Sequence, residues 1–162
     1  MKSKTVIKVI LWIMVLGSAA LIFWFSAQDA TESSGTSGHF ARMIFGIFPS
    51  FRAMSETAQA ELIESAMFVV RKCAHFCFYA FFGFWLMLLV RQYRRTYTLL
   101  ITGAGSLAYA ISDEIHQYFV PGRSCHPRDV CIDLAGSLVG ALIAMLFAVI
   151  WQILRKHKIK GK

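Results

Sequence analysis

The chain has 162 residues, of which 57% are hydrophobic and 16% are charged, and its formal net charge is +8. Soluble domains are about 45–50% apolar and about 25% charged. The excess of apolar residues therefore argues against an ordinary soluble enzyme, a disordered chain and a fibrous protein, and the length suits a single domain over residues 1–162.

Four apolar stretches predict membrane-spanning helices, since a helix needs about 20 apolar residues to cross a bilayer. The predicted spans cover residues 6–25, 67–90, 97–115 and 132–154. The first stretch is longer than the apolar core of about 7–15 residues in a secretory signal peptide, so we expect an uncleaved anchor. The fold class expected is all-α, an integral membrane bundle of about four transmembrane helices.

The segment between the first two spans contains an amphipathic stretch. Apolar residues recur with helical spacing from Phe40 to Phe48, which predicts an extra helix that lies in the membrane interface or re-enters it shallowly. The preceding run Ser33–Gly38 has the composition of a turn. We expect Pro49 to end the amphipathic helix and Ser55 to cap a helix that continues into the second span.

Basic and acidic residues occupy different segments of the chain. The basic flanks of the spans are Lys2, Lys4, Lys8, Arg91, Arg94, Arg95, Arg155, Lys156, Lys158, Lys160 and Lys162. All nine acidic residues fall in the other two connecting segments or the span ends beside them. The positive-inside rule then places both termini in the cytoplasm and the acidic segments outside. Because the basic clusters flank spans, they indicate topology and lipid contact, and no nucleic-acid partner is expected.

Three of the spans carry a polar stripe toward the predicted outer side. The stripes consist of Lys72, His75, Tyr79 and Gly83 on the second span, Ser106, Tyr109, Asp113, His116 and Gln117 on the third, and Asp129, Asp133, Gly136 and Gly140 on the fourth. Lipid rejects such groups, so the stripes are expected to face one another and to form a binding or catalytic site. The spacing of Gly136 and Gly140 indicates close helix packing.

The polar residues suit chemistry on a phosphate ester. Arginine and lysine side chains bind phosphate oxygens, and two histidines on different helices can divide the roles of general acid and base. Asp113, one turn before His116, is expected to orient that ring. The predicted catalytic residues are His75, Asp113, Glu114 and His116. The predicted phosphate- and substrate-binding residues are Arg71, Lys72, Tyr79, Gln117, Arg123 and Asp129. No cofactor is predicted, although a divalent cation on Asp113, Glu114, Asp129 or His116 stays open.

Two signatures resemble those of the VanZ-like integral membrane proteins. The first is Arg71–Phe76 with Tyr79 and Gly83, and the second is Ser112–Arg123 followed by Arg128–Val130, Gly136 and Gly140. The resemblance implies a small multi-pass protein of the bacterial cell membrane, in a family whose founding member is associated with teicoplanin resistance and whose wider superfamily has a proposed kinship with lipid-headgroup enzymes. The chain departs from the family at Phe78, where Glu is frequent, and at Asp133, where Asn is frequent.

The expected function is therefore to bind and modify a phosphate-bearing lipid or cell-envelope precursor, with membrane lipids or a lipid-linked precursor as partners and glycopeptide tolerance as a consequence. A non-catalytic binding or accessory role is the alternative. The remote alternative is a membrane thiol oxidoreductase that uses Cys73, Cys77, Cys125 and Cys131, but their spacing differs from C-x-x-C. A disulfide between Cys125 and Cys131 is compatible with an outer location.

Overall fold

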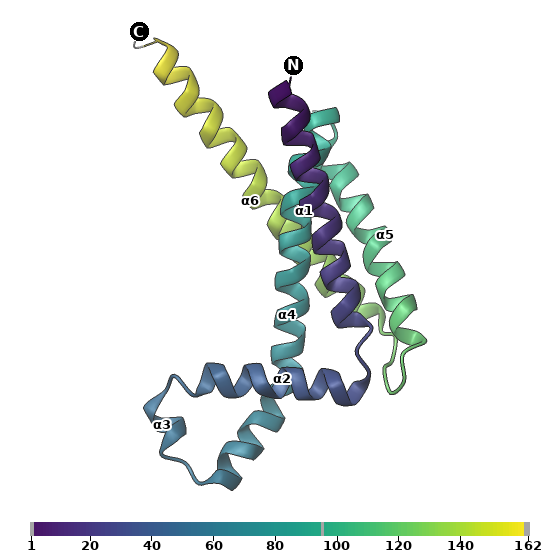
Figure 1. The fold of residues 1–162 in the computed structure, drawn as a ribbon, viewed down its shortest axis with the longest axis vertical. Helices are drawn as coiled ribbons and strands as arrows, with labels where there is room; N and C mark the ends of the chain where they lie inside the picture. The colour runs from purple at the N-terminus through teal and green to yellow at the C-terminus, as the bar shows by residue number, and fades with distance from the viewer. Residues whose placement is uncertain (1, 95, 161–162) are drawn as a thin grey trace.

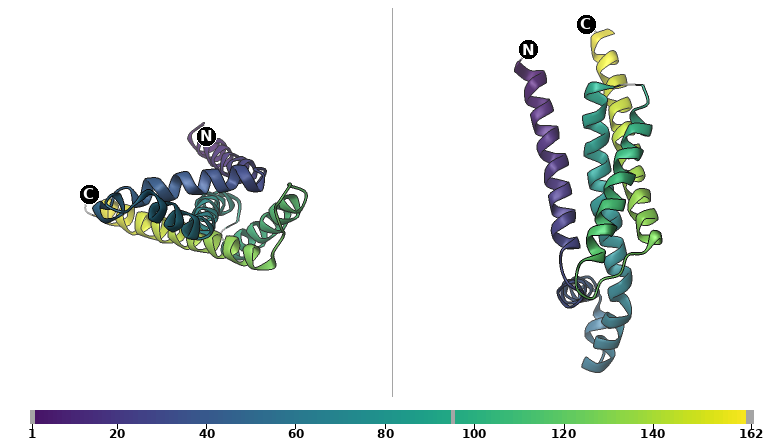
Figure 2. Two further views of the ribbon diagram at one scale, coloured as in Figure 1. Left: turned by 90° about the horizontal axis from the view of Figure 1, so that it is seen from below. Right: turned by 90° about the vertical axis from the view of Figure 1, so that its right-hand side faces the viewer.

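The computed structural model describes residues 2–94 and 96–160, in which the regular structure is helical. The helices are α1 (Lys2–Ser26), α2 (Ala30–Phe45), α3 (Pro49–Arg52), α4 (Glu56–Tyr93), α5 (Thr98–Tyr118) and α6 (Pro127–Lys160). The helices α1, α4, α5 and α6 run along the long axis, and α2 lies across them at one end (Figure 1). The start of α1 and the end of α6 lie at the opposite end (Figures 1 and 2). Arg95 and Lys162 of the predicted basic flanks lie outside the described residues.

Within that described part, the helical segments long and apolar enough to cross a membrane are Lys4–Ser26, Glu56–Tyr93 and Pro127–Lys156. They include the first, second and fourth predicted spans, which the structure shows as helices long and apolar enough to cross a membrane. The third predicted span forms the 21-residue helix α5, which is not in this group. Glycine, serine and threonine residues together with Asp113 and Glu114 interrupt its apolar sequence, so no stretch of α5 is apolar over the length that the other three helices provide. Its crossing of the membrane stays a prediction.

The backbones of α4 and α6 lie in direct contact, because glycines line the interface between the two helices. A Cβ atom at Gly136 would lie 2.4 Å from the carbonyl oxygen of Phe76, and one at Gly83 would lie 2.1 Å from that of Ser137. The close packing predicted from the spacing of Gly136 and Gly140 is confirmed. It sets Asp133 on α6 beside His75 on α4 and so determines the position of the polar site.

The core is small and the outer faces of the helices are apolar. Leu11, Val15 and Ile22 of α1 pack on Tyr79 and Phe82 of α4. Large apolar side chains elsewhere stay exposed, among them Trp12, Leu16 and Trp24 on α1 and Phe147 and Trp151 on α6. Exposed apolar surface of this extent is typical of a lipid-facing surface.

The run Ser33–Gly38 is helical in the structure, and its prediction as a turn is wrong. The side chain of Asp29 accepts hydrogen bonds at 2.8 Å from the backbone N–H groups of Thr31 and Glu32, so it caps α2 well before the amphipathic stretch begins. Ser33 and Ser37 are buried, and α2 packs against α4. Small side chains that are common in turns here allow two helices to approach closely.

The end of α2 also differs from the prediction. The helix ends at Phe45, and Pro49 is the first residue of the short helix α3. Proline suits that position because it needs no backbone N–H there. The predicted cap of the next helix is confirmed, because Ser55 Oγ accepts a hydrogen bond at 3.3 Å from the N–H of Ala58.

Helix α4 is longer than a bilayer requires. Its 38 residues extend roughly 57 Å, whereas the hydrocarbon core is about 30 Å thick. The first turns of α4 pack with α2 and α3 around a separate small core of Ala41, Phe51 and Ile63. These elements together form the end of the molecule that carries the polar site.

Candidate site at the α2 end of the bundle

A polar cavity of about 240 Å³ lies at the end of the bundle where α2 crosses it. It is lined by Phe68, Arg71, Lys72, His75, Glu114, Gln117, Gly122, Arg123, Ser124, His126, Asp129, Ile132 and Asp133. These side chains come from α4, α5, α6 and the loop between α5 and α6. The structure thus brings the three polar stripes together. Of the predicted site residues, Tyr79, Asp113 and His116 do not line this cavity.

His75, Asp113 and Asp133 form a group that we call the buried triad. One side-chain ligand atom from each of the three lies within 4.8 Å of the others. Asp113 is 3% exposed and Asp133 is 1% exposed. Nδ1 of His75 lies 3.7 Å from Oδ1 of Asp133. Asp133 was predicted on the inward face of its helix but not as a site residue.

Asp113 is held in place by neutral groups. Its Oδ2 atom accepts hydrogen bonds from Ser26 Oγ at 2.8 Å and from Gln117 Nε2 at 3.3 Å. Gln117 Nε2 also donates to Ser26 Oγ at 3.1 Å. These bonds join the end of α1 to α5 and fix one oxygen of the carboxylate. The role of Ser26 was not predicted, since nothing in the local sequence points to a partner 87 residues away.

Two arginines beside the cavity are bound by uncharged groups. Arg123 donates from Nη1 to Ser33 Oγ at 2.7 Å and from Nη2 to Gln117 Oε1 at 3.0 Å. Arg71 donates from Nη2 to Ser34 Oγ at 3.1 Å. Among the described side chains, neither guanidinium forms an ion pair with a carboxylate. Burial, and after it the charge of Arg71, lowers the pKa of Arg123, so an anion between the two arginines would relieve an unfavourable arrangement of charge.

The loop between α5 and α6 places Arg123 against α2. The backbone of Gly122 has φ +71°, which glycine adopts without strain. A Cβ atom there would lie 2.8 Å from Cβ of Ala30. The N–H of Ala30 donates to the carbonyl of Pro121 at 3.3 Å. A glycine is therefore required for the turn to approach the start of α2.

Three further predicted residues of the cavity bind groups within the protein. Lys72 forms an ion pair with Asp129, and Oε2 of Glu114 accepts a hydrogen bond at 2.9 Å from the N–H of His126. Glu114 is 2% exposed, so the bond to the loop is shielded from water. These contacts hold the start of α6 and the loop against α4 and α5.

His116 is not part of the buried triad. Its ring stacks on Phe23 of α1 with ring centroids 4.4 Å apart. The hydrogen-bond partners of Asp113 Oδ2 are Ser26 and Gln117, and Asp113 lies close to His75. The structure therefore associates Asp113 with His75, where the sequence predicted an association with His116.

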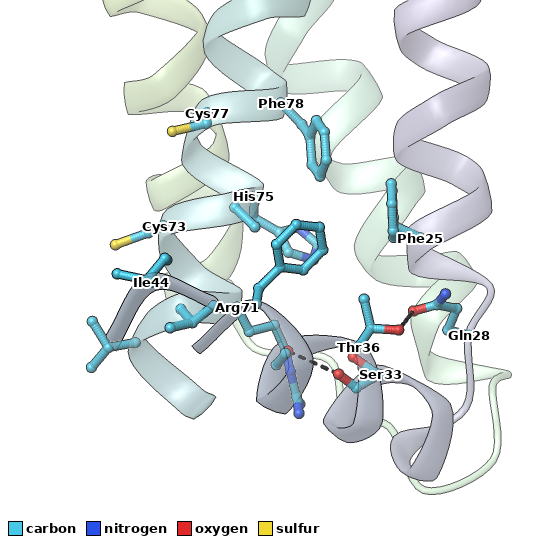
Figure 3. A pocket seen from close by; sticks show the side chains of 15 residues that line it. Phe25, Gln28, Ser33, Thr36, Ile44, Arg71, Cys73, His75, Cys77 and Phe78 are labelled. Atoms are coloured by element: carbon cyan, nitrogen blue, oxygen red, sulfur yellow. Dashed lines mark hydrogen bonds between the residues drawn. The ribbon is translucent and has the colours of Figure 1, made fainter. Parts of the chain in front are cut away.

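An apolar groove of about 360 Å³ lies between α2, α4 and the end of α1 (Figure 3). Phe25 and Phe78 stack across it with ring centroids 5.0 Å apart, and Ile44 of α2 lines another part of the groove. Arg71 and His75 line both this groove and the polar cavity. The two spaces are thus adjacent, one apolar and one rich in charge.

All four cysteines are exposed free thiols. The disulfide between Cys125 and Cys131 considered from the sequence is not formed in the structure. None of the four belongs to the buried triad.

The long apolar helices indicate a helical integral membrane protein, and a polar cavity lies at one end of its bundle. A family model described as VanZ/LLP1 matches residues 9–148. The chain therefore belongs to the VanZ/LLP1 family, which confirms the resemblance seen in its two signatures. Neither the curated proteins nor the solved structures gave a match to the chain.

Proposed function

We propose that this protein binds a phosphate-bearing lipid or lipid-linked cell-envelope precursor and exchanges or hydrolyses its phosphodiester. The observation that carries the proposal is the position of Arg71 and His75, which line the apolar groove and the polar cavity together. An amphiphile is divided in the same way as these two spaces, because its apolar acyl or prenyl chain is joined to a charged headgroup. The chain would lie along the groove and the phosphate would enter the cavity.

The arginines support a phosphate as the bound group. Nε of Arg71 is buried and has no hydrogen-bond partner. Among the described residues, the hydrogen-bond partners of the Arg123 side chain are Ser33 and Gln117, both neutral. Guanidinium groups form strong charge-assisted hydrogen bonds with phosphate oxygens. A phosphate between Arg71 and Arg123 would supply the ion pair that neither arginine forms with a carboxylate among the described residues.

The buried triad supplies the proton acceptor for the chemical step. A water or an acceptor alcohol attacks phosphorus and loses its proton to the triad, and the bond from phosphorus to the leaving headgroup breaks. The triad then returns the proton to the leaving alcohol, so the protein ends in its starting state. Arg71 and Arg123 stabilise the charge on the phosphoryl oxygens during transfer.

The same proposal assigns the site to the outer leaflet, with both termini cytoplasmic. Its support is the separation of charge, since Lys4, Lys8, Arg91 and Arg94 lie at the end remote from the cavity. In right-side-out vesicles, a membrane-impermeant thiol reagent should label Cys125. In a cysteine-free background, Gln92→Cys should be labelled only after permeabilisation. Labelling of Gln92→Cys in sealed vesicles would contradict this orientation.

The deciding experiment follows lipid headgroups by mass spectrometry. The purified wild type, His75→Ala, Arg123→Ala and the control His39→Ala are each added to a total bacterial lipid extract. His39 is exposed on α2 and lines neither the cavity nor the groove. We expect the wild type and the control to change a headgroup, and the other two variants to lose that change.

The same experiment separates turnover from binding. A lipid that co-purifies with the wild type and is lost from Arg123→Ala, without any change of headgroup, would make the protein a binding or accessory protein. Neither turnover nor a co-purified lipid would contradict the proposal as a whole. Glycopeptide tolerance would be a downstream effect of either activity.

A further inference from the structure

We propose that the buried triad, His75, Asp113 and Asp133, is a binding site for a divalent cation of the Zn²⁺ or Mn²⁺ type. This inference goes beyond the proposed function, because its test requires no lipid. One imidazole nitrogen and two carboxylate oxygens, one from each residue, lie within 4.8 Å of one another. Ligands on a tetrahedral Zn²⁺ ion are about 3.4 Å apart when each bond is about 2.1 Å. The three groups can close on an ion through small side-chain movements.

The charge of the triad favours a bound cation, since the ionisable partner of Asp133 is His75, which is charged only when protonated. Asp113 and Asp133 are both nearly inaccessible to solvent, at 3% and 1% exposure. The described residues contain no lysine or arginine paired with either carboxylate, since Lys72 pairs with Asp129 and the two arginines bind serine and glutamine. Buried charges in proteins are paired or bind metals. A divalent cation would neutralise the two carboxylates completely.

Free ligand atoms provide an observation that is independent of the clustering. Oδ1 of Asp113 and Oδ2 of Asp133 are buried without any hydrogen-bond partner. The other oxygen of Asp113 is fixed by Ser26 and Gln117. Metal ligands are typically oriented by such outer hydrogen bonds, which leave one atom free for the ion.

The ligand set indicates which cation fits. Imidazole favours Zn²⁺ and other transition metals, whereas carboxylates also accept Mn²⁺ and Mg²⁺. Three protein ligands leave at least one coordination position for water or substrate. His75 and Asp133 line the polar cavity, so that position can open toward it. If the proposed function also holds, a hydroxide on such an ion would accept the proton of the attacking water or alcohol, and the water so formed would return a proton to the leaving alcohol.

The test measures metal binding directly. The full-length protein is purified in detergent, treated with a chelator, and dialysed against Zn²⁺, Mn²⁺ or Mg²⁺ before elemental analysis. We expect about one equivalent of Zn²⁺ or Mn²⁺ on the wild type, a loss of that equivalent in Asp133→Asn and in His75→Asn, and an affinity about 10–100-fold lower in Ser26→Ala. The controls Glu61→Gln and His39→Asn make the same chemical changes at exposed positions outside the triad and should bind as the wild type does.

A second measurement tests the proposal even if one of the variants fails to fold. Addition of the ion to the chelator-treated wild type should raise its thermal unfolding temperature, and the rise should be absent from whichever triad variant is folded. Binding of less than a tenth of an equivalent by the wild type would overturn the proposal. Undiminished binding in both Asp133→Asn and His75→Asn would overturn it as well.

An infrared spectrum distinguishes a bound ion from a shared proton. A carboxylic-acid band that the wild type keeps in excess Zn²⁺ and Mn²⁺, and that Asp133→Asn lacks, would show that the two carboxylates share a proton and overturn the proposal. Absence of metal with headgroup turnover intact would reject this inference and leave the proposed function standing.

Discussion

Gly140 of α6 meets the backbone of Ala80 in α4 so closely that a Cβ atom on the glycine would lie 1.8 Å from the Ala80 carbonyl oxygen. No rotation of a side chain can relieve that contact, because the obstacle is backbone. The separation of the two helices is therefore set by the absence of one methyl group. The same separation positions Asp133, two helical turns earlier on α6, relative to His75.

Gly140→Ala should accordingly destabilise the protein. Overpacking of this kind typically costs about 1–3 kcal/mol, occasionally more, and here it must move α6 away from α4. The control is Gly17→Ala on α1, where an added Cβ atom meets nothing within 4 Å. It should be neutral or slightly stabilising, since alanine favours a helix more than glycine does. Thermal unfolding in detergent compares the two, and equal unfolding temperatures would contradict the packing described here.

Ser26→Ala should loosen the end of α1. The variant loses the hydrogen bond from Ser26 Oγ to the buried carboxylate of Asp113, and a hydrogen bond to a charged group contributes about 1.5–3 kcal/mol. Ser18→Ala is the matched control, because Ser18 Oγ is also buried in α1 but bonds only to the carbonyl of Val15 in its own helix. Hydrogen exchange should increase at the last turn of α1 in the first variant alone. An unchanged exchange pattern in Ser26→Ala would mean that the bond does not hold α1 to α5.

Asp29→Ala should fray the start of α2. The alanine cannot accept the bonds from the N–H groups of Thr31 and Glu32, and loss of an N-cap costs about 1 kcal/mol. Ser33 and Ser34, which bind Arg123 and Arg71, lie in the next turn. Amide protection in α2 should therefore decrease, and the phosphate binding that we propose should weaken with it. Asp29→Asn retains a capping side chain and should behave as the wild type does.

Cys125 should be alkylated slowly near neutral pH. Local desolvation, followed by the negative charge of Glu114, raises the pKa of the Cys125 thiol, and the thiolate is the reactive form. A raised pKa lowers the thiolate fraction at any pH below it, so the reaction rate should keep rising into the alkaline range. Glu114→Gln removes one of the causes and should move the rate profile toward lower pH. A profile that does not move would place Glu114 farther from the thiol than the structure does.

Local sequence patterns predicted the parts of the fold that depend on neighbouring residues. The cap at Ser55, the continuous helix into the second span and the glycine contact of α6 all follow from spacing along one segment. The phase of each helix also predicted which side chains point inward. These features require no knowledge of which helices are adjacent.

The contacts between distant segments could not be predicted in the same way. Helical phase shows that His116 and Asp113 share an arc, but it does not show that Phe23 of α1 covers the ring of His116. The serines of α2 indicated a turn by composition, yet two of them bind arginines from other helices or loops. Asp133 joined the site because α4 and α6 approach closely, which is a property of the helix pair.

Arg71 belongs to two spaces of opposite character, and this limits what a substitution there can reveal. If the protein binds a lipid as we propose, a change at Arg71 should alter headgroup selectivity and preference for chain length at the same time. Arg123 lines the polar cavity and not the groove, whereas Phe78 lines the groove and not the cavity. A pair of variants at these two positions would vary one preference while holding the other constant. Selectivity for the headgroup and for the chain of a ligand could then evolve independently, through residues that line one space alone. Arg71 and His75, which line both spaces, would hold the junction of the two parts in a constant position.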